Sequence, residues 1–568
     1  MRARRSPVTG RGGRAFSVEH ARWRLTFLGW LMLLLFAGVW GRLLYLQTVK
    51  AEELRELSAR YGGLRKRTWT VYGMRGTIRD RHGNVLAMDV MSLSVYIRPK
   101  AVTEVKQVAQ QLAPVIGSSP PDLEQKILQW RQRIEQAHAA QRAVPTAFTL
   151  ERELVGERAR RLREAVQRER ARLREVMKQT ARSPRPVRLT SWLDGVDIVE
   201  EPRRQYPYGS IASALIGFTD REGQGQAGLE LLLNKRLSPT HGTVEGVLGA
   251  AGQIAVGTRH VVTAPRNGEE VRLTIDVNIQ SIAEECLQEV VRKHQPAGAC
   301  AIVMDIHQGD LLAVANAPSI DLNRWQEEIS QHGLGVMRNL ATMALFEPGS
   351  TFKPIVIAEA MQRGVVGQGS RFYCPGSLKV GKHTIRCAPH GGRRAHGSQT
   401  LEEVVAHSCN VATAQIGMRL GAHALYEGVQ RFGLWDKPLP GAERGRLDRP
   451  EGWQKIRLAN VAFGQGVQVT PIALAAAYAA IANDGVYVKP RLLWNEPVHT
   501  QQVLAPEVAA RMRQYLQAVV DEGTGKLAQV RGYTVAGKTG TAQKVVPGRR
   551  GYAPGKYVAS FVGFAPAE

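Results

Sequence analysis

The sequence of 568 residues is poor in cysteine, in aromatic residues and in acidic residues. It has 5 cysteines and 6% aromatic residues, and it contains neither a zinc-finger spacing nor the aromatic-rich signature of an RNA-binding module. Its 50 acidic residues are outnumbered by 76 basic ones, which gives a net charge of +26. Without a nucleic-acid signature, this charge favours an anionic membrane or an anionic polymer as partner, and no nucleic acid is expected.

Internal repeats and long low-complexity segments are also missing, which excludes a solenoid. The apolar fraction of 44% and the charged fraction of 22% are those of an ordinary folded protein. Because a single hydrophobic core stops growing near ~250 to 300 residues, a chain of this length requires at least two domains.

One uncharged run lies near the amino terminus. Residues 25–41 carry no charge over seventeen positions, and Arg24 and Arg42 flank them. A helix of this length rises ~26 Å, and with snorkelling arginines it can cross a hydrocarbon core of ~30 Å. We therefore predict a transmembrane anchor over 25–46. A cleaved signal peptide is the alternative, but Trp40 and Arg42 occupy the place where small residues would be required.

The two flanks of this segment differ in charge. Residues 1–24 contain seven arginines and one acid, Glu19, whereas residues 50–56 are mixed in sign. The positive-inside rule therefore predicts a cytoplasmic basic tail over 1–24 and an extracytoplasmic position for everything after Gln47. The protein is expected in the cytoplasmic (inner) membrane, crossing it once.

Residues 47–265 contain Gly-rich turns, short β-like runs and one strongly charged stretch over 151–178. Apolar residues recur in this stretch at helical spacing, namely Val155, Leu162, Val166, Leu173 and Met177. We predict an amphipathic helix with a solvated face, within an insert over 151–186. A basic arm for anionic lipid or polymer is the alternative, but charge runs on helices are usually exposed faces.

Residues 266–568 form the second region. A short strand at Val271 precedes a helical pattern, and two apolar runs around the turn 307–310 predict a hairpin. Helical patterns dominate residues 349–484, and β-like runs return at 532–536 and 557–564. Strands, then helices, then strands again predict an α+β domain with a mainly antiparallel sheet.

A serine and a lysine lie three residues apart at a predicted helix start. Pro354 fits the first turn of a helix, so the helix should begin near Ser350 and carry Lys353 on the same face. A lysine with a lowered pKa can take the proton of a serine hydroxyl, and the helix amino terminus favours the negative charge that develops there. Alone, this pair would also suit an ordinary helix start.

Two further motifs follow in the chain. Ser408 and Asn410 form Ser-x-Asn fifty-eight residues after Ser350, and residues 538–541 read Lys-Thr-Gly-Thr. Each tripeptide is weak evidence by itself. Ser-x-x-Lys, Ser-x-Asn and Lys-Thr-Gly in this order form the signature of the penicillin-recognising acyl-serine enzymes.

With these motifs the chain resembles the class B high-molecular-weight penicillin-binding proteins, most closely their division-specific (FtsI-type) and sporulation-type members. The likeness extends to stretches outside the motifs, at 75–87, 204–209, 228–230, 463–466 and 521–525. The resemblance implies a multidomain α+β protein. A pedestal (dimerisation-type) domain would occupy 47–265, and a β-lactamase-like transpeptidase domain, an antiparallel sheet flanked by helices, would occupy 266–568.

The resemblance also implies catalytic roles. Ser350 would attack the penultimate D-alanine carbonyl of a peptidoglycan stem peptide, and Lys353 would take its proton. Ser408 would relay a proton to the leaving D-alanine, and Asn410 would hydrogen-bond Lys353 and the substrate amide. A second stem peptide's amine would then accept the acyl group, which completes D,D-transpeptidation.

The third motif supplies substrate contacts by the same resemblance. Lys538, Thr539 and Thr541 would bind the substrate carboxylate, and Gly540 between them would be a position of close backbone approach. The backbone N–H groups of Ser350 and Thr541 would form the oxyanion hole. No cofactor and no catalytic metal are expected.

By the same resemblance the protein is expected to be a transpeptidase for septal wall synthesis that β-lactams inhibit. A membrane glycan polymerase and other division proteins would be its partners. The alternatives are a β-lactamase or β-lactam sensor, an elongation-type transpeptidase, or a non-enzymatic scaffold of the division machinery. The deacylating Glu-x-x-Asn pattern of one β-lactamase class is missing at Glu443 and Glu451.

The loop over 373–397 differs from many members of the family. It holds two cysteines and three histidines, namely Cys374, His383, Cys387, His390 and His396. These residues could ligate zinc, hold one disulfide or lie on the surface. We predict a disulfide between Cys374 and Cys387 and no metal, and we expect Cys409, like Phe352, to be a packing residue.

In the resembled family a final strand lies between the neighbour of the Lys-Thr-Gly strand, here 556–565, and the first strand, here 299–305. A carboxy-terminal helix follows that final strand. Since the sequence stops at Glu568, both closing elements are expected to be missing. The sequence therefore predicts a truncated chain in which these two strands do not pair with each other.

Overall fold

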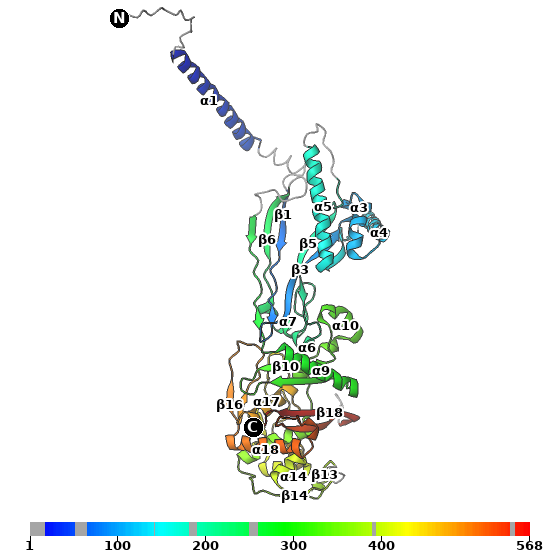
Figure 1. Ribbon diagram of the computed structural model, residues 1–568, viewed down its shortest axis with the longest axis vertical. Coiled ribbons are helices and arrows are strands. Elements are labelled where there is room, and N and C mark those ends of the chain that lie inside the picture. The colour runs from blue at the N-terminus through cyan, green and yellow to red at the C-terminus, as the bar shows by residue number, and fades with distance from the viewer. Residues whose placement is uncertain are drawn as a thin grey trace, which may run out of the picture. The chain divides into compact units, whose positions relative to one another are not determined.

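The computed structural model describes residues 18–50, 65–140, 142–180, 190–248, 260–388, 394–545 and 551–568 (Figure 1). Residues 1–17 of the predicted tail, residues 181–186 of the predicted insert, and His390 lie outside the described residues. The chain divides into two compact units, one formed by 1–71 with 241–265 and the other by 72–240 with 266–568.

The first unit contains helix α1 (Val18–Thr48) and a three-stranded antiparallel sheet. The sheet has the order β1 (Arg65–Val71), β6 (Gly242–Leu248) and β7 (His260–Thr263). Within α1, Thr26–Thr48 is long and apolar enough to cross a membrane, and its most apolar window is 0% buried. This helix agrees with the anchor predicted over 25–46.

The amino-terminal part of the second unit is built around a long central strand, β3 (Val85–Ile97). Strand β5 (Val196–Gln205) pairs with one edge of β3 and β4 (Phe148–Leu154) with the other, both antiparallel. Three helices pack on this sheet, namely α3 (Val105–Ile116), α4 (Pro120–Ala139) and α5 (Gly156–Thr180).

The helix predicted over 151–178 begins later than expected. Residues 151–154 alternate in burial as the end of β4, and α5 starts at Gly156. The buried positions of α5 include Ala159, Leu162 and Ala165, whereas the predicted Val155 and Met177 are exposed. The prediction counted large apolar residues, but the small side chains of alanine allow the closest approach of this helix to its domain.

A second core joins this part to the carboxy-terminal part of the same unit. Strand β2 (Ile78–Arg79) pairs with β3 on one side and in parallel with β8 (Val271–Arg272) on the other. Ile78 and Leu86 are buried in one cluster with Leu273 and Ile472, which lie nearly 200 residues or more further along the chain. The amino-terminal and carboxy-terminal parts of this unit therefore share one core.

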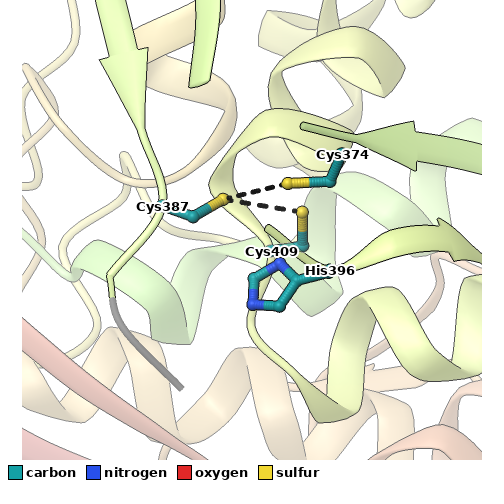
Figure 2. Close-up of side chains that lie close together, drawn as sticks. All are labelled: Cys374, Cys387, His396 and Cys409. Atoms are coloured by element: carbon teal, nitrogen blue, oxygen red, sulfur yellow. Dashed lines mark hydrogen bonds between the residues drawn. The ribbon is translucent and has the colours of Figure 1, made fainter. Parts of the chain in front are cut away.

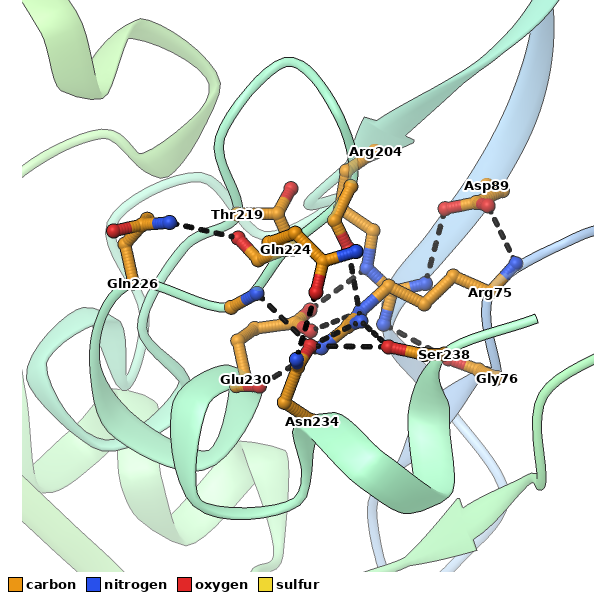
Figure 3. A network of polar contacts seen from close by, with 12 residues as sticks. Arg75, Gly76, Asp89, Arg204, Thr219, Gln224, Gln226, Glu230, Asn234 and Ser238 are labelled. Carbon is orange, nitrogen blue, oxygen red and sulfur yellow. Dashed lines mark hydrogen bonds and ion pairs between the residues drawn. The ribbon is translucent and has the colours of Figure 1, made fainter. Parts of the chain in front are cut away.

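Four charged side chains are buried beside this core (Figure 3). Arg75 Nε donates to Glu230 Oε2 at 2.6 Å, and Arg204 Nε donates to Glu230 Oε1 at 2.7 Å. Asp89 accepts from the backbone N–H of Arg75 at 2.6 Å and from Arg204 Nη1 at 3.2 Å. Each buried charge thus has a partner of opposite sign, which offsets the cost of removing it from water.

The carboxy-terminal part of the second unit contains two long antiparallel strand pairs, several shorter ones and a helical core. Strand β9 (Ala299–Met304) pairs with β10 (Leu311–Ala317), which confirms the predicted hairpin, and helix α9 (Val277–His294) contacts both. Strand β17 (Ala536–Val545) pairs with β18 (Tyr552–Phe564). The strand predicted at 532–536 is displaced, because β17 begins only at Ala536 and continues to Val545.

Within the described residues β9 and β18 are not paired with each other, as the sequence predicted. The helical core includes α12 (Lys353–Gln362), α13 (Leu401–Ala406), α14 (Asn410–Leu420), α15 (Ala422–Arg431), α16 (Lys455–Ala462), α17 (Pro471–Ala482) and α18 (Pro506–Asp521). Short strands β11 (Phe372–Cys374), β12 (Ser377–Val380), β13 (His383–Arg386), β14 (Gly397–Gln399), β15 (Val486–Val488) and β16 (Thr500–Gln502) form small antiparallel pairs. Further short helices are α6 (Ser213–Ile216), α7 (Gly228–Leu232), α8 (Asn234–Leu237), α10 (Trp325–His332) and α11 (Leu340–Met343).

Replacing Glu230 by glutamine should destabilise the second unit strongly. The change leaves Asp89 as the one buried carboxylate beside Arg75 and Arg204. Breaking a buried ion pair costs about 3 to 5 kcal/mol. Thermal unfolding followed by circular dichroism measures the loss. Glu269→Gln breaks the exposed pair with Arg236 and should leave Tm nearly unchanged. Equal melting of the two variants would contradict the proposed importance of the buried network.

Candidate functional site

Ser350 lies in a 3-10 turn, η4 (Gly349–Phe352), that continues directly into α12. Pro354 occupies the first turn of α12, as the sequence predicted. Gly349 has φ +54° and donates its N–H to the carbonyl of Gly464 at 3.0 Å. A Cβ on Gly464 would lie 2.1 Å from the Gly349 carbonyl oxygen, so glycine is required where these two backbones meet.

Ser408 and Asn410 lie at the junction of α13 and α14. A capping box between Thr400 and Glu403 starts α13, and Asn410 is the first residue of α14. Ser408 has φ +55°, an uncommon backbone conformation for a residue other than glycine. Such strain is often found at functional sites, and here it accompanies two contacts from Ser408 to one amine.

The Lys353 amine is fully buried and surrounded by acceptors from this junction. Its Nζ donates to the Ser408 carbonyl at 2.5 Å, to Ser408 Oγ at 3.1 Å and to Asn410 Oδ1 at 2.6 Å. Burial lowers the pKa of Lys353 to about 8. A substantial fraction of this amine is therefore neutral near physiological pH, as a general base requires.

Lys538 is the second buried amine of the site. Its Nζ donates to Thr524 Oγ1 and to the Thr539 carbonyl, both at 3.3 Å. Burial, and then the charge of Lys353, lower the pKa of Lys538 to about 7. Thr539 Oγ1 also donates to Thr524 Oγ1 at 3.0 Å, so the two threonines hold the start of β17 in place.

A cleft of about 250 Å³ lies where these elements meet. Its lining includes predicted residues of all three motifs, namely Ser350, Ser408, Asn410, Thr539 and Thr541. Gly349, Ala388, His407, Phe463, Gln465, Thr524 and Ala542 complete the lining. Lys353 does not line the cleft itself but contacts Ser408 and Asn410, which do. Lys538 and Gly540 are the sequence neighbours of Thr539 and Thr541 in β17. The structure thus brings all the predicted site residues together.

The sequence interpretation missed several residues in or near this cleft. Thr524 contacts both Lys538 and Thr539, and it lies in the stretch 521–525 that already resembled the family. His407 carried no signal in the sequence. Glu347 is buried, and it accepts from the Gly466 N–H at 2.9 Å and from the Tyr552 hydroxyl at 3.1 Å. Burial raises the pKa of Glu347, so its carboxyl group binds protons more readily than usual.

The predicted disulfide between Cys374 and Cys387 is wrong. Their sulfurs are 3.6 Å apart and both residues are free cysteines, although a disulfide requires about 2.05 Å. Cys409, predicted as a packing residue, lies with its sulfur 3.7 Å from that of Cys387. His396 joins the same cluster, whereas His383 is exposed.

The thiols of this cluster influence one another. A hydrogen bond with Cys409 lowers the pKa of Cys387, and the same contact, with burial, raises the pKa of Cys409. Of these two thiols, Cys387 is therefore the one that loses its proton more readily.

Comparison with known proteins agrees with this geometry. The family model described as the penicillin binding protein transpeptidase domain matches residues 299–568, and that of the penicillin-binding protein dimerisation domain matches 70–273. Stage V sporulation protein D of Bacillus subtilis is 32% identical over 96% of this chain and 80% of the relative. The chain belongs to the class B penicillin-binding proteins.

Two further likenesses support membership of the class B penicillin-binding proteins. The probable peptidoglycan D,D-transpeptidase PenA of Neisseria meningitidis is 31% identical over 96% of this chain and 86% of the relative. The crystal structure of penicillin binding protein 3 from Mycobacterium tuberculosis in complex with aztreonam has a TM-score of 0.60 and 25% identity. That likeness covers 88% of each chain.

Gly540→Ala should impair this penicillin-binding site. The added Cβ would lie 2.6 Å from Ser560 Oγ and 2.9 Å from the backbone oxygen of Pro348, so β17 would have to move away from the turn that carries Ser350. Overpacking of this kind costs about 1 to 3 kcal/mol, and we expect acylation by a fluorescent penicillin to slow by about tenfold or more.

Gly369→Ala is the matched control, because nothing lies within 4 Å of its added Cβ and its φ is ordinary. It should acylate at the rate of the unmodified protein. The close approach at Gly540 would lose its importance if both alanine variants acylated at that same rate.

Proposed function

We propose that this class B penicillin-binding protein cross-links peptidoglycan stem peptides by D,D-transpeptidation, with Ser350 as the acylated nucleophile. The observation that carries the proposal is the buried Lys353 amine, which bonds to Ser408 and Asn410 beside a cleft that Ser350 lines. The transpeptidase domain that matches over 299–568 contains all of these residues.

In the acylation step the Ser350 hydroxyl oxygen attacks the carbonyl carbon of the penultimate D-alanine. The hydroxyl proton passes to neutral Lys353, and the carbon–nitrogen bond to the terminal D-alanine breaks. Ser408, whose Oγ lies 3.1 Å from Lys353 Nζ, then donates its hydroxyl proton to the leaving amine and takes the proton from Lys353 in its place, so Lys353 becomes neutral again. An ester of Ser350 remains and terminal D-alanine is released.

In the second step an amine of another stem peptide attacks this ester. The amine loses a proton to the same basic group, the ester bond breaks, and Ser350 regains its hydroxyl proton. The product is a new peptide bond between two stem peptides. The backbone N–H groups of Ser350 and Thr541 are our proposed donors to the oxyanion in both steps.

The carboxylate of the substrate would be bound at the start of β17. The Lys538 charge would attract this carboxylate, and Thr539 and Thr541 line the same cleft. A β-lactam carries an equivalent carboxylate and a strained amide, so it should acylate Ser350 in place of the peptide.

We further propose a role in septal wall synthesis. The lead-in Phe346-Glu347 to the nucleophile resembles division-type members. The excess of arginine before α1 supports a cytoplasmic amino terminus with the catalytic region on the outer side. A membrane glycan polymerase and other division proteins would then act beside this enzyme.

Ser350→Ala should abolish labelling by a fluorescent penicillin without changing Tm, because the change removes the nucleophile and no packing contact of the core. Ser330→Ala, at an exposed position of α10, is the matched control and should label normally. In cells that contain Ser350→Ala alone, septation should stop and filaments should form.

Three results would argue against parts of this proposal. Labelling that persists in Ser350→Ala would refute the nucleophile, and normal division with that variant would indicate a scaffold. Rapid release of the bound penicillin would indicate a β-lactamase. Round cells in place of filaments would indicate an elongation-type enzyme.

The rate constant of acylation should depend on pH as a bell. Lys353 must be neutral, a state that is gained as the pH rises through about 8, whereas Lys538 must be cationic, a state that is lost as the pH rises through about 7. Because the two amines interact, both limbs belong to the pair, and the maximum should fall between about pH 7 and about pH 8.

Stopped-flow measurement of penicillin acylation between about pH 6 and about pH 9 tests this profile. Lys538→Arg keeps its charge throughout this range and should lose the alkaline limb. A flat profile for the unmodified protein, or an alkaline limb that persists in Lys538→Arg, would contradict the assigned roles.

A further inference from the structure

Three cysteines and one histidine point toward one another beside the catalytic cleft (Figure 2). Cys374 ends β11, Cys387 follows β13, His396 precedes β14, and Cys409 caps the start of α14. One ligand atom from each residue lies within 4.8 Å of the other three. The three cysteines are buried.

The spacing of the sulfurs suits a tetrahedral metal ion. A zinc–sulfur bond of about 2.3 Å places two sulfurs of a tetrahedron about 3.8 Å apart. The sulfurs of Cys374 and Cys387 are 3.6 Å apart, and those of Cys387 and Cys409 are 3.7 Å apart. A disulfide between any two would leave the third thiol unpaired in the same buried cluster.

The imidazole of His396 points to a metal rather than to packed thiols. Both of its ring nitrogens are buried and neither has a hydrogen-bond partner within the described residues. Burying a polar nitrogen without a partner is costly, and buried polar groups are nearly always satisfied. A metal ion bound among the three sulfurs would give one of these nitrogens its missing partner.

Backbone N–H groups surround the sulfurs in the way that metal-bound thiolates require. Gly376 donates to Cys374 at 3.4 Å, and Ala412 donates to Cys409 at 3.3 Å. The N–H of Val411 donates to the sulfur of Cys387 at 3.5 Å. Donors of this kind stabilise negative sulfur, and they orient a ligand before the metal arrives.

We propose that Cys374, Cys387, His396 and Cys409 bind one structural Zn²⁺ ion. Three thiolates and an imidazole form a soft set that favours zinc over magnesium or calcium. Four protein ligands leave no open position for substrate or water, so the ion would have a structural role. The four ligands lie at or next to the ends of β11, β13, β14 and α14, so the ion would fasten this loop region to α14.

The site would also hold the catalytic Ser-x-Asn motif, a consequence that rests on the proposed function. Cys409 lies between Ser408 and Asn410, which supply the acceptors of the Lys353 amine. Asn410 Nδ2 also donates at 2.9 Å to the carbonyl of Arg386, the neighbour of Cys387. Zinc bound to Cys387 and Cys409 would fix both sides of this contact, so zinc-free protein should acylate slowly.

The first experiment measures metal content in the full chain, purified in detergent with reductant and added zinc. Inductively coupled plasma mass spectrometry should find about one zinc per chain. His396→Ala and Cys374→Ser should each lose most of it, and Cys374→His, which keeps a ligand, should retain it. Cys286→Ser, on the exposed face of α9, is the matched control and should retain all of it.

A second measurement does not depend on how the variants fold. Protein prepared with Co²⁺ in place of zinc should show the visible absorption bands of a tetrahedral thiolate site. Removal of the metal by a chelator should slow acylation of the unmodified protein by about 10- to 100-fold, and zinc should restore it. Ser350→Ala should bind zinc normally, so metal binding is read separately from transpeptidase function.

Three outcomes would overturn the zinc site. The first is a zinc content far below one ion per chain together with the absorption spectrum of octahedral cobalt. The second is a full zinc content in both His396→Ala and Cys374→Ser. The third is a disulfide between two of the three cysteines in the purified protein. Iron in place of zinc would overturn the choice of metal. Unchanged acylation after complete removal of zinc would refute the link to the Ser-x-Asn motif alone.

Discussion

The burial of one lysine amine is the constraint on which the catalytic region depends. Lys353 Nζ is buried away from solvent and donates to three acceptors, all from Ser408 and Asn410. An amine in this position is stable only while these oxygens stay in place. The left-handed backbone at Ser408, the capped helix α13 and the start of α14 all serve to keep them there.

The layer behind the reacting groups is held by equally specific contacts. The turn that carries Ser350 is fixed from one side by Gly464 and from another by Tyr478, whose buried hydroxyl donates to the Thr351 carbonyl at 2.7 Å. Strand β17 approaches the same turn through Gly540, where no side chain fits. The position of the nucleophile is therefore set by backbone contacts, which tolerate little change in residue size.

The three motifs taken together were sufficient to predict which residues meet at the cleft, although each motif alone was weak evidence. The alternation of strand and helix patterns was sufficient to predict the α+β fold, because those patterns are local. The anchor and the 299–317 hairpin followed from hydrophobic patterns for the same reason. The sulfur cluster could be predicted only in part. The sequence groups Cys374, Cys387 and His396 in one loop, but Cys409 joins them only through the packing of α14. Long-range packing also explains why α5 starts later than predicted, because residues 151–154 pair with β3 as the end of β4.

The core shared by Ile78, Leu86, Leu273 and Ile472 limits which segments related proteins can exchange by recombination. Two family models divide the chain between residues 273 and 299, as though it were two exchangeable modules. The buried cluster, however, contains residues from both sides of this boundary. A recombination event that replaced only one side would bring together apolar surfaces that had never adapted to each other, and the hybrid would begin with an imperfect core. Successful exchange between relatives should therefore carry segments from both sides together.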